Sequence, residues 1–113
     1  MLTVQEDAKI AVSKHATKRL KERSGLNKRA TKRMAEKAFK NGCFREETKG
    51  ELRFWLDERF YSHLDEGERE VLVYGDKAYV FSLPSKENSA YVLITVMQVP
   101  KQHLDHIDSY LIH

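Results

Sequence analysis

Three residues near the start of the chain, His15, Arg19 and Arg23, recur every four positions. On a helix of 3.6 residues per turn this spacing puts them on one stripe. An imidazole exchanges protons near neutral pH, and guanidinium groups offer forked donors that match phosphate oxygens. Metal-independent cleavage of RNA needs a base for the 2′-hydroxyl and a cation for the charge that develops on the phosphate. We therefore consider His15 and Arg19 as candidate catalytic residues.

A third catalytic group would have to come from a strand, where side chains are held rigidly. The polar-tipped candidates are Tyr74, Lys77, Tyr79 and Thr95, of which Thr95 is the small hydroxyl in the mostly apolar run 90–99. We predict that His15, Arg19 and Thr95 converge on one pocket between the first helix and this strand. Two plainer interpretations stay open: a structural, partly buried His15 with one hydrogen bond, and a Thr95 chosen for its β propensity.

The charge of the chain is distributed unevenly. Residues 8–49 contain fourteen Lys or Arg against four Glu, whereas the remainder is net acidic. Such a one-signed surface attracts polyanions, so we predict nucleic acid as the partner, RNA more than DNA; a solubilising face is the alternative. The predicted contact residues are the basic ones of the segment 14–33: Lys14, Lys18, Arg19, Lys21, Arg23, Lys28, Arg29, Lys32 and Arg33.

Length and composition predict one soluble domain, 1–113, of which 41% is apolar. Cys43 is the single cysteine, so no internal disulfide is expected and a reducing, cytoplasmic location fits best. No apolar run reaches membrane-spanning length, and the first residues do not read as a signal peptide. No nucleotide-binding glycine motif occurs, and the spacing of His103, His106 and His113 matches no closed metal site, so we expect neither cofactor nor metal.

The first half of the chain, 13–62, reads as helical and basic. A helix is predicted from Ser13, a suitable N-cap, to the glycine at position 25. Asn27 can cap a second helix that ends at 41–42, because its apolar residues follow helical spacing. The apolar spacing predicts a third helix over about 51–62. Residues 1–12 would form an N-terminal arm.

The second half changes to strand patterns. The runs 71–74 and 77–82 flank Gly75-Asp76 and predict a hairpin, and 90–99 predicts the longest strand. Both faces of this sheet, 71–99, are apolar, so the tail 100–113 or a second copy of the chain must cover one of them. We predict an α+β fold in which two or three N-terminal helices pack on a three-stranded antiparallel β-meander.

Several segments carry a resemblance to known proteins. They are 13–16, Arg19, 22–23, 25–26, 47–50, 74–81 and 93–96. Over residues 13–100 these segments resemble a family of small proteins encoded by bacterial phages and prophages. More distantly, the leading His-Ala helix with its arginines and the late Ile-Thr-Val strand are similar to the barnase, EndoU, colicin and RelE ribonuclease-toxin superfamily. That likeness implies a RelE/barnase-like fold with an RNA site between helix and sheet, built on His15, Arg19, Arg23 and Thr95.

Three functions therefore remain open after the sequence. The protein is expected to be an RNA-binding module of phage origin, a toxin-like endoribonuclease that needs no metal, or a non-catalytic phage protein that docks on an acidic host partner. A homodimer through the outer sheet face or the tail is a further expectation. Charge alone supports all three functions, because each of them needs a basic face.

Overall fold

Helix α1 (Lys14–Ser24) begins and ends where the sequence predicts. The computed structural model describes residues 9–60, 69–84, 86 and 89–112. The Ser13 hydroxyl accepts a hydrogen bond from the Ala16 amide at 3.1 Å, which satisfies one of the free donors of the first turn. Gly25 ends the helix in the left-handed conformation, with φ of 68°, which a residue without Cβ adopts at little cost.

Helices α2 (Lys28–Asn41) and α3 (Gly50–Phe60) follow. The Asn27 side chain caps α2 by accepting from the Ala30 amide at 2.8 Å, as predicted. The predicted end of the third helix, residues 61–62, lies outside the described residues. Within the described ranges no helix is both long and apolar enough to cross a membrane.

The sheet has five strands in the order β1-β5-β4-β3-β2. The predicted hairpin is present as β3 (Arg69–Tyr74) and β4 (Lys77–Ser82), and Gly75 has a φ of 62° in its turn. Strand β5 (Tyr91–Gln98) pairs antiparallel with β4, completing the predicted meander. The two outer strands are β1 (Ile10–Val12) and β2 (Cys43–Phe44).

The outer strands correct the predicted three-stranded antiparallel sheet. Strand β1 runs parallel to β5, with Ile10 opposite Tyr91, so the sheet is mixed. Part of the predicted N-terminal arm is therefore a strand, and residues 1–8 lie outside the described part. Strand β2 adds to the other edge, antiparallel to β3. The α+β class is confirmed.

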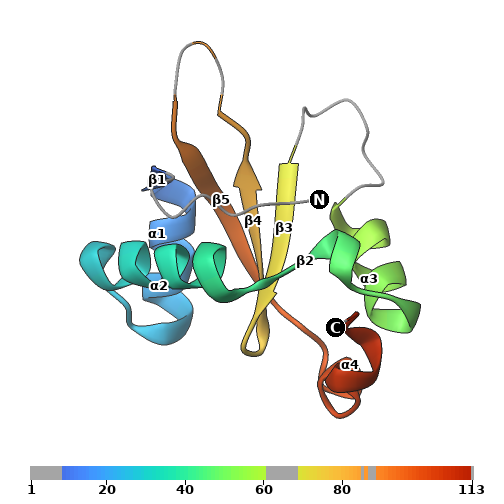
Figure 1. Cartoon of the computed structure of the whole chain (residues 1–113). Helices are drawn as coiled ribbons and strands as arrows, with labels where there is room; N and C mark the ends of the chain where they lie inside the picture. Colours follow the sequence, from blue (N-terminus) through green and yellow to red (C-terminus); the bar gives the residue numbers. More distant parts are fainter. Residues whose placement is uncertain (1–8, 61–68, 85, 87–88, 113) are drawn as a thin grey trace.

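Helices α1 and α2 cover one face of the sheet, which we call the first face (Figure 1). Phe39 of α2 lies at the centre of this core. Its ring centroid lies 4.5 Å from that of Tyr91 and 5.2 Å from that of Phe81. Ala16 and Leu20 of α1 pack in the same cluster. Burial of these apolar side chains holds both basic helices against the sheet.

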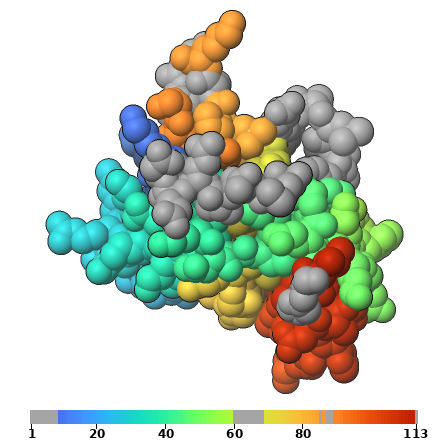
Figure 2. Space-filling view, viewed as in Figure 1, coloured from blue at the N-terminus to red at the C-terminus, as the bar shows by residue number. Residues whose placement is uncertain are grey.

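The second face is covered by α3 and the C-terminal tail, on the opposite side of the sheet in Figure 1. Leu52 and Leu56 of α3 are fully buried in this second core. The tail contains α4 (Lys101–Leu104) and the 3₁₀ helix η2 (Ile107–Tyr110). Its packing residues are Leu104, Ile107, Tyr110 and Leu111. In Figure 2 the red tail lies beside the green atoms of α3. The tail is thus the cover of this face within one chain.

Truncation after Pro100 should uncover the second core. The lost contacts of about four apolar side chains, at ~1 kcal/mol each for partial burial, should lower the melting temperature by at least about 10 °C. Differential scanning calorimetry and binding of a hydrophobic dye measure the two effects. A full-length His106→Ala variant, changed at an exposed tail position, serves as the control. A truncated chain as stable as the full chain would show that the tail does not stabilise the sheet.

Candidate nucleic-acid interface

The nine predicted contact residues lie on α1 and α2, which cover the first face. Arg19 is half-buried, and the other eight are exposed. None of the nine forms an ion pair with another described residue. Their charges are therefore not neutralised within the described chain, and the two helices present a basic surface to solvent.

On α1 the basic residues divide into two stripes. Lys14, Lys18 and Lys21 lie opposite the buried Ala16 and Leu20, so they point away from the sheet. The stripe of His15, Arg19 and Arg23 runs along the border of the buried side. Because four residues turn through slightly more than one full helical turn, this stripe approaches the sheet toward the C-terminal end of α1.

A pocket lies where this stripe meets the sheet, and we call it the α1–sheet pocket. Its volume is about 260 Å³. Arg19, Leu20, Arg23 and Ser24 line it from α1, and Lys77, Val96 and Gln98 line it from β4 and β5. Three cationic side chains thus share one concave site, which suits an anion with several oxygens, such as phosphate.

The sheet side of this pocket is held by Asp76. The Lys77 ammonium donates to its carboxylate at 2.9 Å, and the Gln98 amide donates to its backbone carbonyl at 2.9 Å. The hydrogen bond from Lys77 is the main reason that the pKa of Asp76 lies below its ordinary value. A second bond from the Gln98 amide, to the Asp76 carboxylate at 3.2 Å, lowers it further. Lys77 is therefore fixed in position, and Arg19 and Arg23 supply the uncompensated charge.

A second hollow lies on α2, and we call it the α2 groove. Its floor is Leu26, Ala30 and Met34, and Arg33 and Lys37 flank it. The volume is about 210 Å³. An apolar floor between two cations can accept an apolar group that belongs to an anionic partner.

His15 is exposed at the first turn of α1 and does not line the α1–sheet pocket. Among the described residues no hydrogen bond reaches its imidazole. The structural interpretation of a partly buried, hydrogen-bonded His15 is therefore wrong. A catalytic base is normally oriented by a partner, and no described residue orients His15.

Thr95 lies on the opposite side of the sheet from α1, which contradicts the predicted pocket of His15, Arg19 and Thr95. Thr95 pairs with Val80, and Val80 belongs to the second core. Directly opposed residues of antiparallel strands share a face, so Thr95 points toward the second face. The cause is a bulge: Phe81 pairs with Leu93, so Ile94 is an extra residue that shifts the alternation.

The structure also places the other strand candidates, Tyr74, Tyr79 and Lys77. Tyr79 is buried in the first core, and its ring centroid is 6.5 Å from that of Tyr74. Burial, together with the nearby charge of Asp76, raises the pKa of Tyr79 to about 12. A raised pKa keeps the phenol protonated at neutral pH, where only the phenolate could act as a general base. Of the strand residues considered, only Lys77 joins the α1–sheet pocket.

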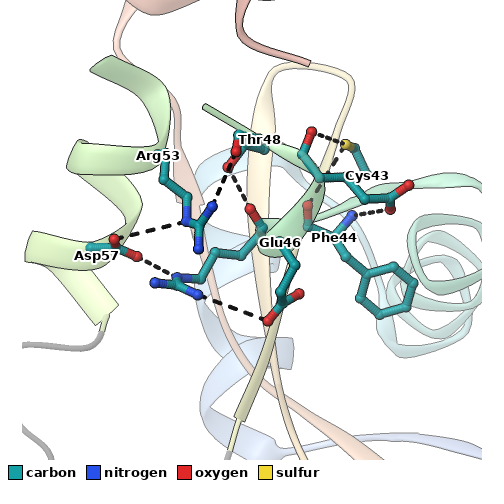
Figure 3. Close-up of polar contacts among 8 residues, drawn as sticks. Cys43, Phe44, Glu46, Thr48, Arg53 and Asp57 are labelled. Carbon is teal, nitrogen blue, oxygen red and sulfur yellow. Dashed lines mark hydrogen bonds and ion pairs between the residues drawn. The ribbon is translucent and has the colours of Figure 1, made fainter. Parts of the chain in front are cut away.

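Two other arginines, Arg45 and Arg53, form contacts within the fold (Figure 3). Arg45 donates to the Asp57 carboxylate, and Arg53 donates to the Thr48 carbonyl at 3.2 Å. The Thr48 hydroxyl donates to the Arg45 carbonyl at 2.6 Å. These contacts join the segment after β2, which contains the 3₁₀ helix η1 (Arg45–Glu47), to α3. These two arginines stabilise the fold and are not part of the basic surface.

Cys43 lies at the start of the same segment. Its thiol is 3.7 Å from the carbonyl oxygens of Phe44 and Glu47, to which it can donate weak hydrogen bonds. Burial, assisted by the charge of Glu47, raises the pKa of Cys43 from 9.0 to about 11. The raised pKa favours the protonated thiol, which is a weaker nucleophile than the thiolate.

Within the described part of the chain, no three His, Cys, Asp or Glu residues are grouped as metal ligands. His103 is buried at 5% exposure and His106 is exposed, while His113 lies outside the described residues.

No protein-family model, curated protein or solved structure matches this chain. The function must therefore be inferred from the residues of the site and their geometry.

The rate at which the Cys43 thiol is alkylated tests whether it is half-buried beside Glu47, as its raised pKa requires. At pH 8 the folded protein should react with iodoacetamide roughly 100-fold more slowly than the urea-unfolded chain, because a rise from 9.0 to about 11 lowers the thiolate fraction by that factor. Mass spectrometry of timed samples measures both rates. Similar rates in the two states would place the thiol in an open environment instead.

Proposed function

We propose that the protein binds nucleic acid, RNA in preference to DNA, through the basic surface of α1 and α2. The observation that carries this proposal is the set of nine cationic side chains without an ion-pair partner among the described residues. A surface kept only for solubility would carry acidic residues interspersed among the cations, whereas the segment 14–33 contains Glu22 alone. Binding would release counterions from the phosphate backbone.

The α1–sheet pocket would hold one phosphate group of the nucleic acid in a defined position. Arg19 and Arg23 can each donate two parallel hydrogen bonds to phosphate oxygens, and the Lys77 ammonium, although paired with Asp76, lies in the same pocket. The exposed lysines of α1 and the cations of α2 would then contact neighbouring phosphates along the strand. Phosphate contacts position a protein without reading sequence, so we expect binding with little sequence preference.

We favour binding over cleavage. A ribonuclease site on this face would need an acid and a base near Arg19, but Thr95 belongs to the other face and His15 lacks an orienting partner among the described residues. We therefore expect total RNA to stay intact when it is incubated with the protein in excess chelator. Cleavage that is lost in a His15→Ala variant would reverse this preference.

The affinity for RNA should fall steeply with salt. For a single strand the slope of log affinity against log salt is about −0.7 per phosphate contacted, so about five contacts give a slope near −3.5. Fluorescence anisotropy with a labelled 20-nucleotide RNA, and with single-stranded and duplex DNA of the same sequence, measures the slope and the preference. Absence of binding at low salt, or binding indifferent to salt, would remove the proposal.

The same titration can locate the surface. The double substitution Arg29→Glu with Arg33→Glu should reduce both the affinity and the slope. The matched control reverses two exposed cations on the other side of the sheet, Arg59→Glu with Lys101→Glu. If both doubles weaken binding equally, net charge and not the α2 surface determines the affinity.

The pocket makes a separate prediction. Arg19→Ala should weaken RNA binding roughly tenfold, as expected for the loss of about 1.4 kcal/mol from one charge-assisted contact. Thr95→Val, a change of similar shape on the opposite face, should leave the affinity unchanged. An effect of Thr95→Val as large as that of Arg19→Ala would contradict the assignment of the site to the first face.

The α2 groove favours one second candidate, docking on an acidic host protein. An amphipathic acidic helix could place an apolar side chain on Met34 and its carboxylates against Arg33 and Lys37. A labelled acidic amphipathic peptide, titrated beside the RNA, separates the two functions. Peptide binding that is abolished by Met34→Glu, in a protein that does not bind RNA, would replace the first candidate by the second.

A further inference from the structure

A third pocket lies away from the basic surface, between α3 and α4, and we call it the α3–α4 pocket. Its volume is about 690 Å³. It is lined mainly by Glu51, Phe54, Trp55 and Glu58 of α3 and by Gln102 and His103 of α4. The four α3 residues follow the spacing i, i+3, i+4 and i+7, so they form one face of that helix.

The walls of this pocket are aromatic. Phe54 is 69% exposed, although a phenyl ring gains free energy from burial. Trp55 and His103 continue the wall, with ring centroids 6.2 Å apart, and His103 also contacts Tyr110 at 6.3 Å. His103 is only 5% exposed, and its Nδ1 has no hydrogen-bond partner among the described residues. An aromatic wall with an exposed phenyl ring is a surface suited to a ligand.

The rim of the pocket is acidic. Glu51 and Glu58 lie one turn before and one turn after the aromatic pair, and neither forms an ion pair with another described residue. The Tyr110 hydroxyl donates to Glu51 at 3.3 Å, which leaves the negative charge in place. Two carboxylates beside aromatic faces attract a cation and repel phosphate.

We propose that the α3–α4 pocket binds an arginine side chain presented by a partner protein. A guanidinium group can stack flat on the rings of Phe54 and Trp55 while its N–H groups donate to the flanking carboxylates. Lysine would gain the charge contact but not the planar stacking. This site is independent of the proposed nucleic-acid function, since its charge is of opposite sign and it lies on the other side of the sheet.

Trp55 is the only tryptophan of the chain, so its fluorescence reports directly on this pocket. The probe is the peptide acetyl-Gly-Arg-Gly-amide. Its neutral control replaces arginine by citrulline, which has nearly the same shape without the charge. The arginine peptide should cause a saturable change in Trp55 emission, and the citrulline peptide should bind at least about tenfold more weakly.

Variants of the full chain test the two parts of the site. Phe54→Ala should weaken binding about two- to fivefold, the effect expected of one exposed cation–π contact, and the exposure of Phe54 means that the fold should tolerate it. Glu58→Gln should weaken binding to a similar degree. Glu36→Gln removes the same charge from an exposed position on α2 and is the matched control.

Circular dichroism and the melting temperature establish that each variant is folded. Equal binding of the arginine and citrulline peptides would overturn the proposal, because it would show that the pocket does not select for charge. Equal loss in Glu58→Gln and Glu36→Gln would also overturn it, because net charge alone would then act. RNA binding is measured separately on the same variants and should not change with Phe54→Ala, so failure of one proposal leaves the other intact.

Discussion

Val71, Leu72 and Val73 are consecutive residues of β3, and all three are buried. Because successive side chains of a strand point to opposite faces, both faces of the central sheet must be covered by other parts of the chain. The amphipathic pair α1 and α2 covers one face, and α3 with the tail covers the other. This double burial decides where every charged surface can lie, since the polar side of each cover must face solvent.

The parts of the fold that the sequence predicts are those with strong local signals. Ser13, Gly25 and Asn27 act through their own backbone contacts, so the helix boundaries could be read directly. Strands β1 and β2 contain three and two residues, too few to show a period of two, and they form because a longer neighbour pairs with them. Their pairing depends on distant parts of the chain, which no local pattern reveals.

The candidate site also contains residues that could be predicted from the sequence and one that could not. The basic residues could be predicted because an excess of Lys and Arg is visible in the sequence itself. Arg19 and Arg23 do line one pocket. The face of the sheet on which Thr95 lies could not be predicted from the sequence. Strict alternation from Leu93 would put Thr95 on the side of α1, but the bulge at Ile94 turns it to the other face. A one-residue irregularity without a sequence signal therefore separates it from the proposed interface.

The arginines of this protein serve two different purposes, and their partners distinguish them. Arg45 and Arg53 are both paired with Asp57, and Arg53 also donates to the Thr48 carbonyl, so their charge is used within the fold. Arg19 and Arg23 have no such carboxylate among the described residues. On a polyanion, the field of the unpaired cations would turn α1 and α2 toward the strand, while the carboxylates of the α3–α4 pocket would be repelled from it. An orientation of this kind would leave the α3–α4 pocket open to solvent.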